Sequence, residues 1–461
     1  MRQTTERQQV FESLPVPRAV TAMVLPAIIS QIIHVVYNLA DTWFVGLTGD
    51  ANTVAAISLC LPVYNIMTGL SNLFGVGGAS VIARFLGSGN RDRAKRSFAV
   101  AAWGAAAVSV VYALLLLLFG HGLLLRIGAD EGSIDYAWTY TIVTVILGGL
   151  PTVLAATLSN LIRAVGESRR AAVGMTLGAV LNIALDPLFM FVILPRGNEV
   201  LGAAIATTLA NVVSLVYFAV YFRRSGEEIF SFAPRLLRHG RRIARDILSC
   251  GLVGFSMVAL AMVSNCFLNA MIADLGGGAA VAGLGIVRKI DSLAYAVNQG
   301  ITQGMLPLVA FCYASGKSER MRVVIRFSTV CTVTFSLVCS ALSYIIAPQL
   351  VEVFIRDGAT VSFGTAFLRV LCLAIPIYSV TFVIIAVFQA VGRSIEPFAL
   401  SVLHKDSFDI LLLFLIRRMF GLRYILWATP VMETTALAAA LILLHGLLRA
   451  QNRTTIKEVI R

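Results

Sequence analysis

Charged residues are scarce in this chain of 461 residues. Asp, Glu, Lys and Arg make up only 13% of it, whereas a typical soluble protein has about 25%. Apolar residues reach 58%, and the mean hydropathy is +0.84. Stretches of roughly 20 apolar residues, each long enough to cross a bilayer as a helix, recur along the whole length. The composition leaves no room for a soluble domain and predicts an all-α integral membrane protein.

The sequence also lacks the motifs of common catalytic sites. It has no GxSxG, HExxH or phosphate-binding GxxxxGK[ST] pattern, and its five histidines are scattered. The seven cysteines fall in apolar segments without CxxC spacing, so we expect small buried side chains and no disulfide framework. A membrane-embedded transferase or protease would need a nucleophile or metal constellation that is missing. We therefore expect no enzyme and no cofactor, and transport powered by an ion gradient or a partner.

Polar, Gly/Pro and charged breaks divide the chain into twelve predicted transmembrane helices. They cover residues 18–46, 53–83, 97–119, 136–162, 171–194, 200–222, 247–273, 279–313, 323–347, 362–391, 397–416 and 422–448. A long polar segment at 223–246 separates the helices six and six. We predict an N-terminal six-helix bundle at 1–222, a basic cytoplasmic linker at 223–246 and a C-terminal six-helix bundle at 247–461.

The positive charges predict the orientation of these helices. If both chain ends share one side, 27 Lys and Arg residues fall on that side, 6 on the other and 4 inside spans. Cytoplasmic loops carry such an excess of Lys and Arg. We therefore expect cytoplasmic termini in the cell's inner (plasma) membrane. Topology and contact with anionic lipid account for the net charge of +13, so nucleic-acid binding is an unnecessary hypothesis.

The two halves of the sequence repeat each other. LGSGNRDRAKR (86–96) resembles YASGKSERMRV (313–323), and Gly77 and Arg93 shift by 227 positions onto Gly304 and Arg320. A second similarity joins IRAVGES (162–168) to FQAVGRS (388–394). Because six is an even number, both copies have the same orientation in the membrane. Such parallel repeats suit alternating access around a site between the halves.

The first span carries a polar stripe. His34, Tyr37, Asn38 and Asp41 follow the i, i+3, i+4, i+7 spacing of one helix face. An ionised carboxylate at the centre of a bilayer costs roughly 2.5–3.5 kcal/mol on insertion scales, so Asp41 is either paired or functional. A polar contact between helices is the alternative, although a hydroxyl or amide would serve it more cheaply. Pro26 removes a backbone hydrogen bond and allows this helix to bend.

The fifth and sixth spans provide possible companions for Asp41. In GAVLNIALDPLFMF (178–191), Asn182 and Asp186 lie one turn apart and Pro187 follows the acid. In GAAIATTLAN (202–211), small residues around Thr207 and Thr208 favour close helix approach. Two carboxylates, an amide oxygen and a hydroxyl make a plausible site for a proton or a hard cation. For the threonines alone, packing is the simpler reading.

The second half lacks acids at the matching positions. Its ionisable residues form two other clusters, for which structural pairing or reaching toward the membrane surface is the simpler reading. These clusters are Arg288, Lys289 and Asp291 in span eight, and Lys405, Asp406 and Asp409 in span eleven.

The chain resembles the multidrug and toxic compound extrusion (MATE) family of secondary transporters. The resemblance rests on LPAIISQIIHVVYNLADTWFVGLTG, GVGGASVIARFLGSGNRDRAKR, RAVGES, NIALDPLFMF and GAAIAT, in that order. It implies two six-helix bundles in a V that export diverse organic, often cationic aromatic, compounds in exchange for H⁺ or Na⁺. It also implies that Asp41, Asn182, Asp186 and Thr207 form a cation site, with Asn160 as a further candidate. The chain departs from members that carry acids in spans seven and ten.

One alternative within membrane transport stays open. A lipid-linked or polyisoprenoid flippase of the wider superfamily would favour a cationic central cavity, for which Arg288 and Lys289 are the only mid-span basic pair. For the antiporter we expect a monomer whose partners are small organic substrates and membrane lipid. His34, Tyr37, Asn38 and Asn160 are the predicted pathway residues. Two carboxylates sharing a low-dielectric site cannot both stay ionised and unpaired, so Asp41 and Asp186 should hold a proton or a sodium ion.

Overall fold

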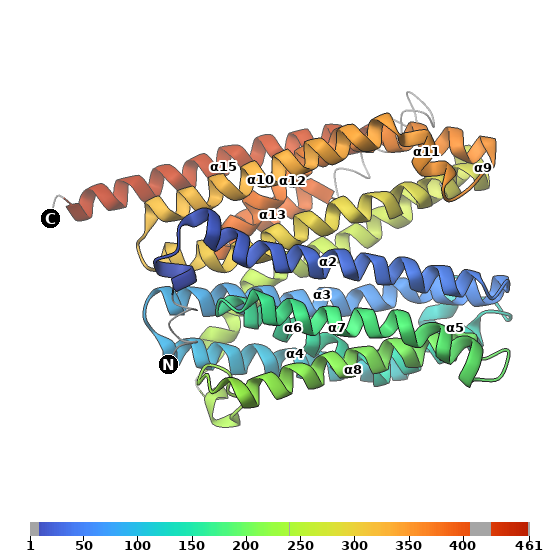
Figure 1. Cartoon of the computed structure of the whole chain (residues 1–461), viewed down its shortest axis with the longest axis horizontal. Coiled ribbons are helices and arrows are strands. Elements are labelled where there is room, and N and C mark those ends of the chain that lie inside the picture. The colour runs from blue at the N-terminus through green and yellow to red at the C-terminus, as the bar shows by residue number, and fades with distance from the viewer. Residues whose placement is uncertain (1–8, 239, 406–425, 460–461) are drawn as a thin grey trace.

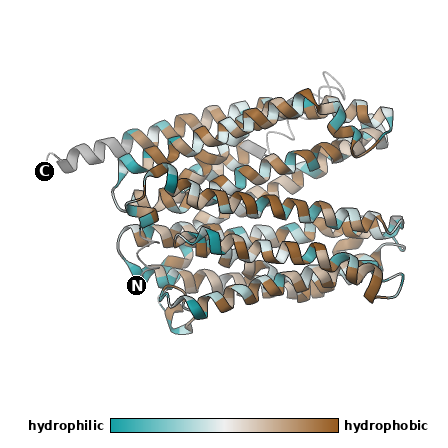
Figure 2. Ribbon diagram, viewed as in Figure 1, coloured by the Kyte–Doolittle hydropathy of each residue, from teal (hydrophilic) through white to brown (hydrophobic). Residues whose placement is uncertain are grey.

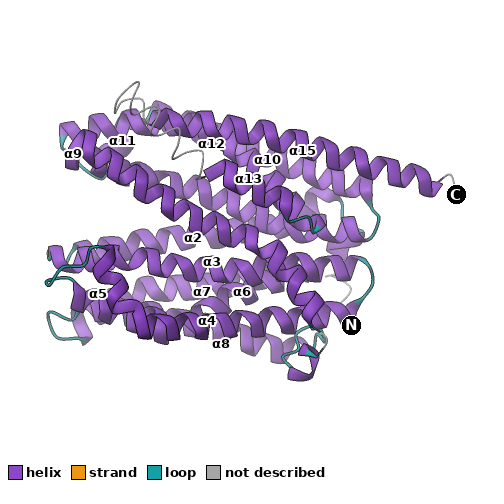
Figure 3. Ribbon diagram, turned by 180° about the vertical axis from the view of Figure 1, so that it is seen from behind, coloured by secondary structure: helices purple, strands orange, loops and turns teal. Residues whose placement is uncertain are grey.

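The computed structural model describes residues 9–238, 240–405 and 426–459. All regular secondary structure in these ranges is helical, as Figure 3 shows. In chain order the elements are α2 (Val16–Gly46), α3 (Ala51–Gly87), α4 (Arg91–Ile127), α5 (Ile134–Thr141), the π-helix η1 (Ile142–Leu147), α6 (Gly149–Ala164), α7 (Ser168–Pro187), the π-helix η2 (Leu188–Ile193), α8 (Glu199–Ser225), the 3₁₀-helix η3 (Pro234–Leu237), α9 (Arg241–Ala314), α10 (Ser318–Ile345), α11 (Ala347–Glu352), α12 (Gly358–Val391), α13 (Ile395–Lys405) and α15 (Ala428–Val459).

The prediction of a membrane protein built from twelve helices agrees with this architecture. Among the described residues, nine helices are long and apolar enough to cross a membrane, and ten if the bent pair 134–147 and 149–164 is one span. The seventh and eighth predicted spans are both in α9, which breaks at Gly277, where φ is 63°. The eleventh predicted span coincides with α13 up to Lys405, and its remainder lies outside the described residues.

The fourth predicted span is bent in a way that the sequence did not indicate. Its two parts, α5 with η1 and α6, meet at an angle of 50°. The π-helix η1 leads into Gly148 and Gly149, and Pro151 follows in the first turn of α6. The Val143 carbonyl accepts a hydrogen bond from Thr208 Oγ1 of α8 at 2.9 Å. Thr208 therefore joins α8 to the bend, which is a packing role.

The helices form two groups that follow the chain order. Helices α2–α8 make the N-terminal lobe and α9–α15 make the C-terminal lobe, and Figure 1 shows them side by side. Helix α2 begins and α15 ends at the same end of the molecule, which we call the terminal end. The lobes lie closest there and diverge toward the opposite end (Figures 1 and 3). Apolar residues cover the middle of the helices, and polar residues gather in the loops (Figure 2).

Glycine allows the lobes to touch backbone to backbone. A Cβ atom on Gly77 of α3 would lie 2.2 Å from the Ile247 carbonyl oxygen of α9, and one on Gly251 would lie 1.7 Å from the Leu73 carbonyl oxygen. The repeat produces the same contact a second time. A Cβ atom on Gly304 would lie 2.7 Å from Cα of Val24 in α2. Positions 24 and 251 are themselves 227 residues apart, which is the shift between Gly77 and Gly304. The sequence repeat is therefore a structural repeat at the junction of the lobes.

The segment between the lobes packs against the N-terminal lobe. The rings of Phe230 and Phe232 lie 5.4 and 5.3 Å from the ring of Phe98 in α4. The indole N–H of Trp103 donates to the Phe232 carbonyl at 3.0 Å, and Arg91 pairs with Glu227 at 2.8 Å. These contacts attach residues 227–232 to α4. Only residues 233–240 therefore lie between this packed segment and the start of α9.

Replacing Gly251 by alanine should weaken the junction of the lobes. The new methyl group would overlap the Leu73 carbonyl, and overpacking of this kind costs about 1–3 kcal/mol. We expect a lower midpoint of thermal unfolding for purified Gly251→Ala protein in detergent. Gly285→Ala, beyond the break of α9 at Gly277, is the control, because nothing lies within 4 Å of its Cβ position. Equal midpoints for the two variants would contradict the proposed close contact.

Candidate functional site

A cluster of buried polar side chains joins α7 and α8. The amide Nδ2 of Asn182 donates to Asp186 Oδ1 at 3.2 Å and to Thr207 Oγ1 at 3.3 Å. Asp186 is 0% exposed, Asn182 1% and Thr207 4%. Small residues bring the two helices together, since a Cβ on Gly178 would lie 2.1 Å from Ser214 Oγ. The structure thus brings together the three residues that the sequence predicted in spans five and six.

The cluster contains oxygen atoms that no donor satisfies. Within the described part of the chain, Asp186 Oδ2, Asn182 Oδ1 and Asp41 Oδ1 are buried and have no hydrogen-bond partner. A buried acceptor without a partner costs about 1–3 kcal/mol, and more when it is charged. Oxygen atoms of carboxylates and amides are the ligands that hard cations prefer. Asp41, Asn182 and Asp186 thus each carry an unsatisfied oxygen atom of the type that hard cations prefer.

Asp41 approaches this cluster from α2. Its side chain is half-buried. Asp41 follows Tyr37 by one turn of α2, and Tyr37 lines a cavity together with Asn182 and Thr207. Among the described residues, no group of three or more His, Cys, Asp or Glu side chains could hold a metal ion.

A small cavity lies beside the cluster. It has a volume of about 40 Å³, enough for a few water molecules. Its lining includes the predicted residues His34, Tyr37, Asn182 and Thr207, together with Tyr64 and Asn211, which sequence reasoning missed. Asn211 follows Thr207 by four positions and donates to the Thr207 carbonyl at 3.0 Å, so helical spacing could have identified it. Nothing in the sequence singles out Tyr64.

The remaining predicted residues lie in different places. Asn38 is exposed and donates to the His34 carbonyl in its own helix at 2.8 Å, and it is not among the residues that line the small cavity. Pro26 lies inside α2, which continues through it as one helix. Pro187 is the last residue of α7, and the wider π-helix η2 begins at the next position.

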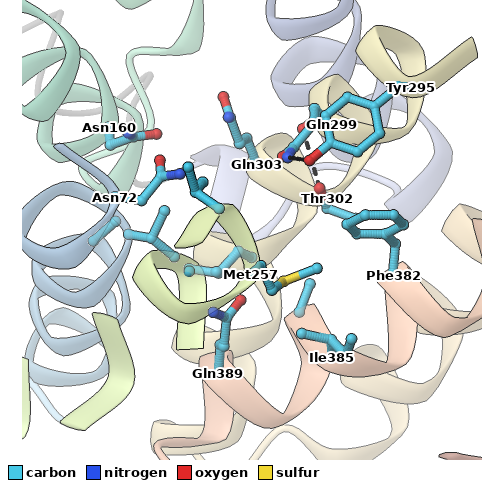
Figure 4. A pocket seen from close by; sticks show the side chains of 16 residues that line it. Asn72, Asn160, Met257, Tyr295, Gln299, Thr302, Gln303, Phe382, Ile385 and Gln389 are labelled. Carbon is cyan, nitrogen blue, oxygen red and sulfur yellow. Dashed lines mark hydrogen bonds between the residues drawn. The ribbon is translucent and has the colours of Figure 1, made fainter. Parts of the chain in front are cut away.

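Asn160 belongs to a second cavity, between the lobes, which we call the interlobe cavity. It has a volume of about 60 Å³. Figure 4 shows five side-chain amides around it, from α3, α6, α9 and α12, with Tyr295 and Phe382 at one side. The amide residues are Asn72, Asn160, Gln299, Gln303 and Gln389. The rings of Tyr295 and Phe382 are 5.5 Å apart. Asn160 thus lies in a compartment separate from the carboxylates.

A third cavity, in the C-terminal lobe, brings Asp291 of a predicted cluster together with Glu433, which the sequence analysis overlooked. It has a volume of about 140 Å³ and is lined by Arg288, Asp291, Tyr378 and Glu433, among others. The Tyr378 hydroxyl donates to Asp291 at 2.9 Å, and Arg288 donates to Asn269 at 2.9 Å. Glu433 of α15 is 2% exposed. Arg288 therefore shares this cavity with two acids, Asp291 and Glu433.

The second basic and acidic cluster of the C-terminal half is only partly described. Asp406 and Asp409 lie outside the described residues, and Lys405 ends α13. The i, i+3 spacing predicts that Arg288 pairs with Asp291. In the structure Arg288 donates to Asn269 instead, and Asp291 accepts from Tyr378.

The chain belongs to the MatE family, which its sequence matches over residues 26–188 and again over residues 255–415. The second match ends 227 positions after the first, as the repeat requires. The chain is 28% identical to the multidrug export protein MepA of Staphylococcus aureus (strain NCTC 8325 / PS 47) over 455 residues, 99% of each chain. It is also 28% identical to MepA of Staphylococcus saprophyticus over 440 residues, 95% of this chain and 96% of the relative.

Solved structures share the fold. An outward-facing multidrug resistance MATE transporter of the MOP superfamily superposes with a TM-score of 0.89 at 22% identity, over 97% of this chain and 98% of the other. A MATE structure in complex with MaL6 gives a TM-score of 0.90 at 23% identity, over 96% of this chain and 99% of the other. The protein is therefore a multi-pass membrane protein with the two-lobed MATE fold.

Proposed function

We propose that this protein is an antiporter that exports organic, often cationic aromatic, compounds across the cytoplasmic membrane in exchange for H⁺ or Na⁺. The observation that supports it most directly is the set of three buried oxygen atoms without partners on Asp41, Asn182 and Asp186, among the described residues. Such atoms are costly in a low-dielectric interior unless a cation or proton compensates them. Thr207 Oγ1, which accepts a hydrogen bond from Asn182, supplies a further oxygen atom.

Coupling follows if the cation and the organic compound favour different arrangements of the N-terminal lobe. A ligand shifts an equilibrium only by its difference in affinity for the two states. Pro26 in α2 and Pro187 at the end of α7 are the points where the helices that carry Asp41 and Asp186 are least constrained by backbone hydrogen bonds. Two solved relatives with TM-scores of 0.90 and 0.88 are described as straight and bent conformations of MATE. We infer that occupancy of the cation site bends α2 and α7.

The interlobe cavity supports the choice of aromatic compounds. Tyr295, Phe382 and Met257 provide aromatic and thioether surface, and the amides provide hydrogen bonds without charge. Aromatic and Met side chains suit a pocket that accepts varied apolar ligands. The Staphylococcus relatives are named multidrug export proteins, which supports export of varied organic compounds.

The terminal end of the molecule should face the cytoplasm, because 27 Lys and Arg residues of the sequence are assigned to the side of the chain ends and 6 to the other side. We expect a cysteine placed at Arg238, in a cysteine-free background, to resist a membrane-impermeant thiol reagent in intact cells. A cysteine at Arg196, between η2 and α8, is the control for the other side and should react. Both side chains are exposed. Labelling at position 238 but not at 196 would reverse the orientation.

Replacing Asp41 by asparagine should abolish export. The substitution keeps the size of the side chain but removes the charge that binds the cation. Cells that express the protein should tolerate a lipophilic aromatic cation better than cells without it, and Asp41→Asn should lose this tolerance at equal abundance in the membrane. Asp135→Asn, at an exposed position of α5, should keep it. Full tolerance with Asp41→Asn would assign that carboxylate a structural role.

Sodium and protons should compete for the same carboxylates. Adding Na⁺ at constant pH should release protons from the purified protein, because Asp41 and Asp186 cannot hold both ions. A pH-indicator dye in weakly buffered detergent solution measures the release. The double variant Asp41→Asn with Asp186→Asn should release no more than protein-free micelles. Release that persists in the double variant would place the coupling site elsewhere, with Asp291 and Glu433 as the next carboxylates to test.

A further inference from the structure

Hydrogen bonds join the two lobes toward the terminal end. The Ser80 hydroxyl of α3 donates to the Gln389 carbonyl of α12 at 2.6 Å. Arg163 of α6, which is 3% exposed, donates through Nη1 to Gln303 Oε1 of α9 at 2.8 Å. Export from the cytoplasm requires the lobes to part at this end. Any segment that bridges them there therefore opposes the opening.

Residues 9–12 form such a bridge, and we call them the strap. They are a turn of helix that precedes α2 of the N-terminal lobe, yet they pack on the C-terminal lobe at the terminal end (Figure 1). The ring of Phe11 stacks on that of Phe311, in the last turn of α9, with the ring centroids 4.9 Å apart. Arg320 of α10 donates through Nη2 to the Val10 carbonyl at 3.2 Å. Phe11 is 4% exposed, so the strap is part of the packed core.

Parting of the lobes would break this contact. Helix α2 is tied to the N-terminal lobe, because its Met23 carbonyl accepts from the Ser168 hydroxyl of α7 at 2.5 Å. Phe311 lies at the junction itself, since a Cβ atom on Gly87, at the end of α3, would lie 2.4 Å from the Phe311 carbonyl oxygen. The strap thus follows one lobe while Phe311 follows the other. The lobes cannot separate here until Phe11 leaves Phe311.

The repeat shows a related arrangement in the linker. Helices α4 and α10 begin at positions 91 and 318, which are 227 residues apart. Residues 227–232 precede the first helix of the C-terminal lobe and pack on α4 of the N-terminal lobe, where Trp103 donates to the Phe232 carbonyl. The strap precedes the first helix of the N-terminal lobe and is bound by α10 of the C-terminal lobe. Each lobe therefore holds the segment that leads into the other lobe.

The contact of the strap is balanced between opposing effects. The aromatic stack and the burial of Phe11 favour it. Arg320 Nε is buried and has no partner among the described residues, and a buried charged donor without a partner is costly. Water can reach this group once residues 9–12 move away. Such a balance is what a reversible contact requires.

We propose that residues 9–12 are a strap that holds the terminal end closed and must leave Phe311 and Arg320 before the lobes part there. Its release admits the organic compound to the export path, and its return closes the path behind the compound. This inference rests on the proposed function, because it names the contact that controls entry to the same path.

A native cysteine reports opening of the terminal end. Cys250 of α9 is 1% exposed, and its Sγ lies 3.6 Å from Arg84 Nη2 of α3, across the junction. In purified full-length protein with Cys250 as its only cysteine, the rate of reaction with a fluorescent maleimide follows the fraction of open molecules. We expect Phe11→Ala to raise this rate about tenfold, which corresponds to about 1.4 kcal/mol. An unchanged rate would overturn the proposal.

Two controls separate release of the strap from general loosening. Phe218→Ala removes a ring that is buried within the N-terminal lobe, 5.6 Å from that of Tyr217, and should change the Cys250 rate less than about twofold. Cys372 of α12 is 2% exposed within the core of the C-terminal lobe. With Cys372 as the only cysteine, Phe11→Ala should leave the rate unchanged. Equal acceleration by Phe218→Ala, or at Cys372, would overturn the strap.

Milder variants test the stack itself if Phe11→Ala does not fold. Phe11→Leu and Phe311→Leu keep an apolar side chain, and each should accelerate Cys250 labelling about threefold. The double variant should react no faster than the faster single variant, because one stack can be lost only once. Accelerations that multiply would show that the two rings act separately, against the proposal. Labelling needs no transported compound or ion gradient, so it is read independently of the export assays that test the proposed function.

Discussion

The contact between the lobes is the constraint on which the rest of the structure depends. Two pseudo-equivalent crossings, α3 on α9 at Gly77 and Gly251 and α2 on α9 at Gly304 and Val24, bring backbones to within the distance that only glycine permits. Lipid gives helices no hydrophobic reason to associate, so close packing of small residues must hold them together. Because the lobes meet only toward the terminal end, they diverge at the other, and the interlobe cavity lies where they separate.

Charge is distributed unequally between the lobes. The N-terminal lobe holds two carboxylates with oxygen atoms that no described donor satisfies, whereas the interlobe cavity is lined by neutral described residues and backed by Arg163. The C-terminal lobe holds its acids, Asp291 and Glu433, in a separate cavity with Arg288 and Tyr378. Sites in separate compartments can bind a cation and the organic compound at the same time or in turn, which is the physical requirement for any coupling between them.

The repeat explains the backbone but not this inequality. The shift of 227 positions carries Gly77 onto Gly304 and Val24 onto Gly251, so both copies preserve the packing at the junction. In the sequence, the same shift carries both Asp41 and Asp186 onto leucines, at positions 268 and 413, so neither acid is repeated. Packing at the junction constrains both copies because each must cross the other lobe. A binding site needs to exist only once, so its residues are free to diverge between the copies.

The sequence by itself determined the class of fold and identified the three residues of the buried polar cluster between α7 and α8. Hydropathy locates the membrane helices, because backbone groups in lipid must form their hydrogen bonds within their own helix. Helical spacing placed Asn182 and Asp186 on one face. Only the tertiary structure decided which helices face one another. It placed Tyr64 beside Thr207, Glu433 near Tyr378 and Arg163 between the lobes. Such contacts depend on the rotation and crossing of helices far apart in the chain, which no local pattern of residues encodes.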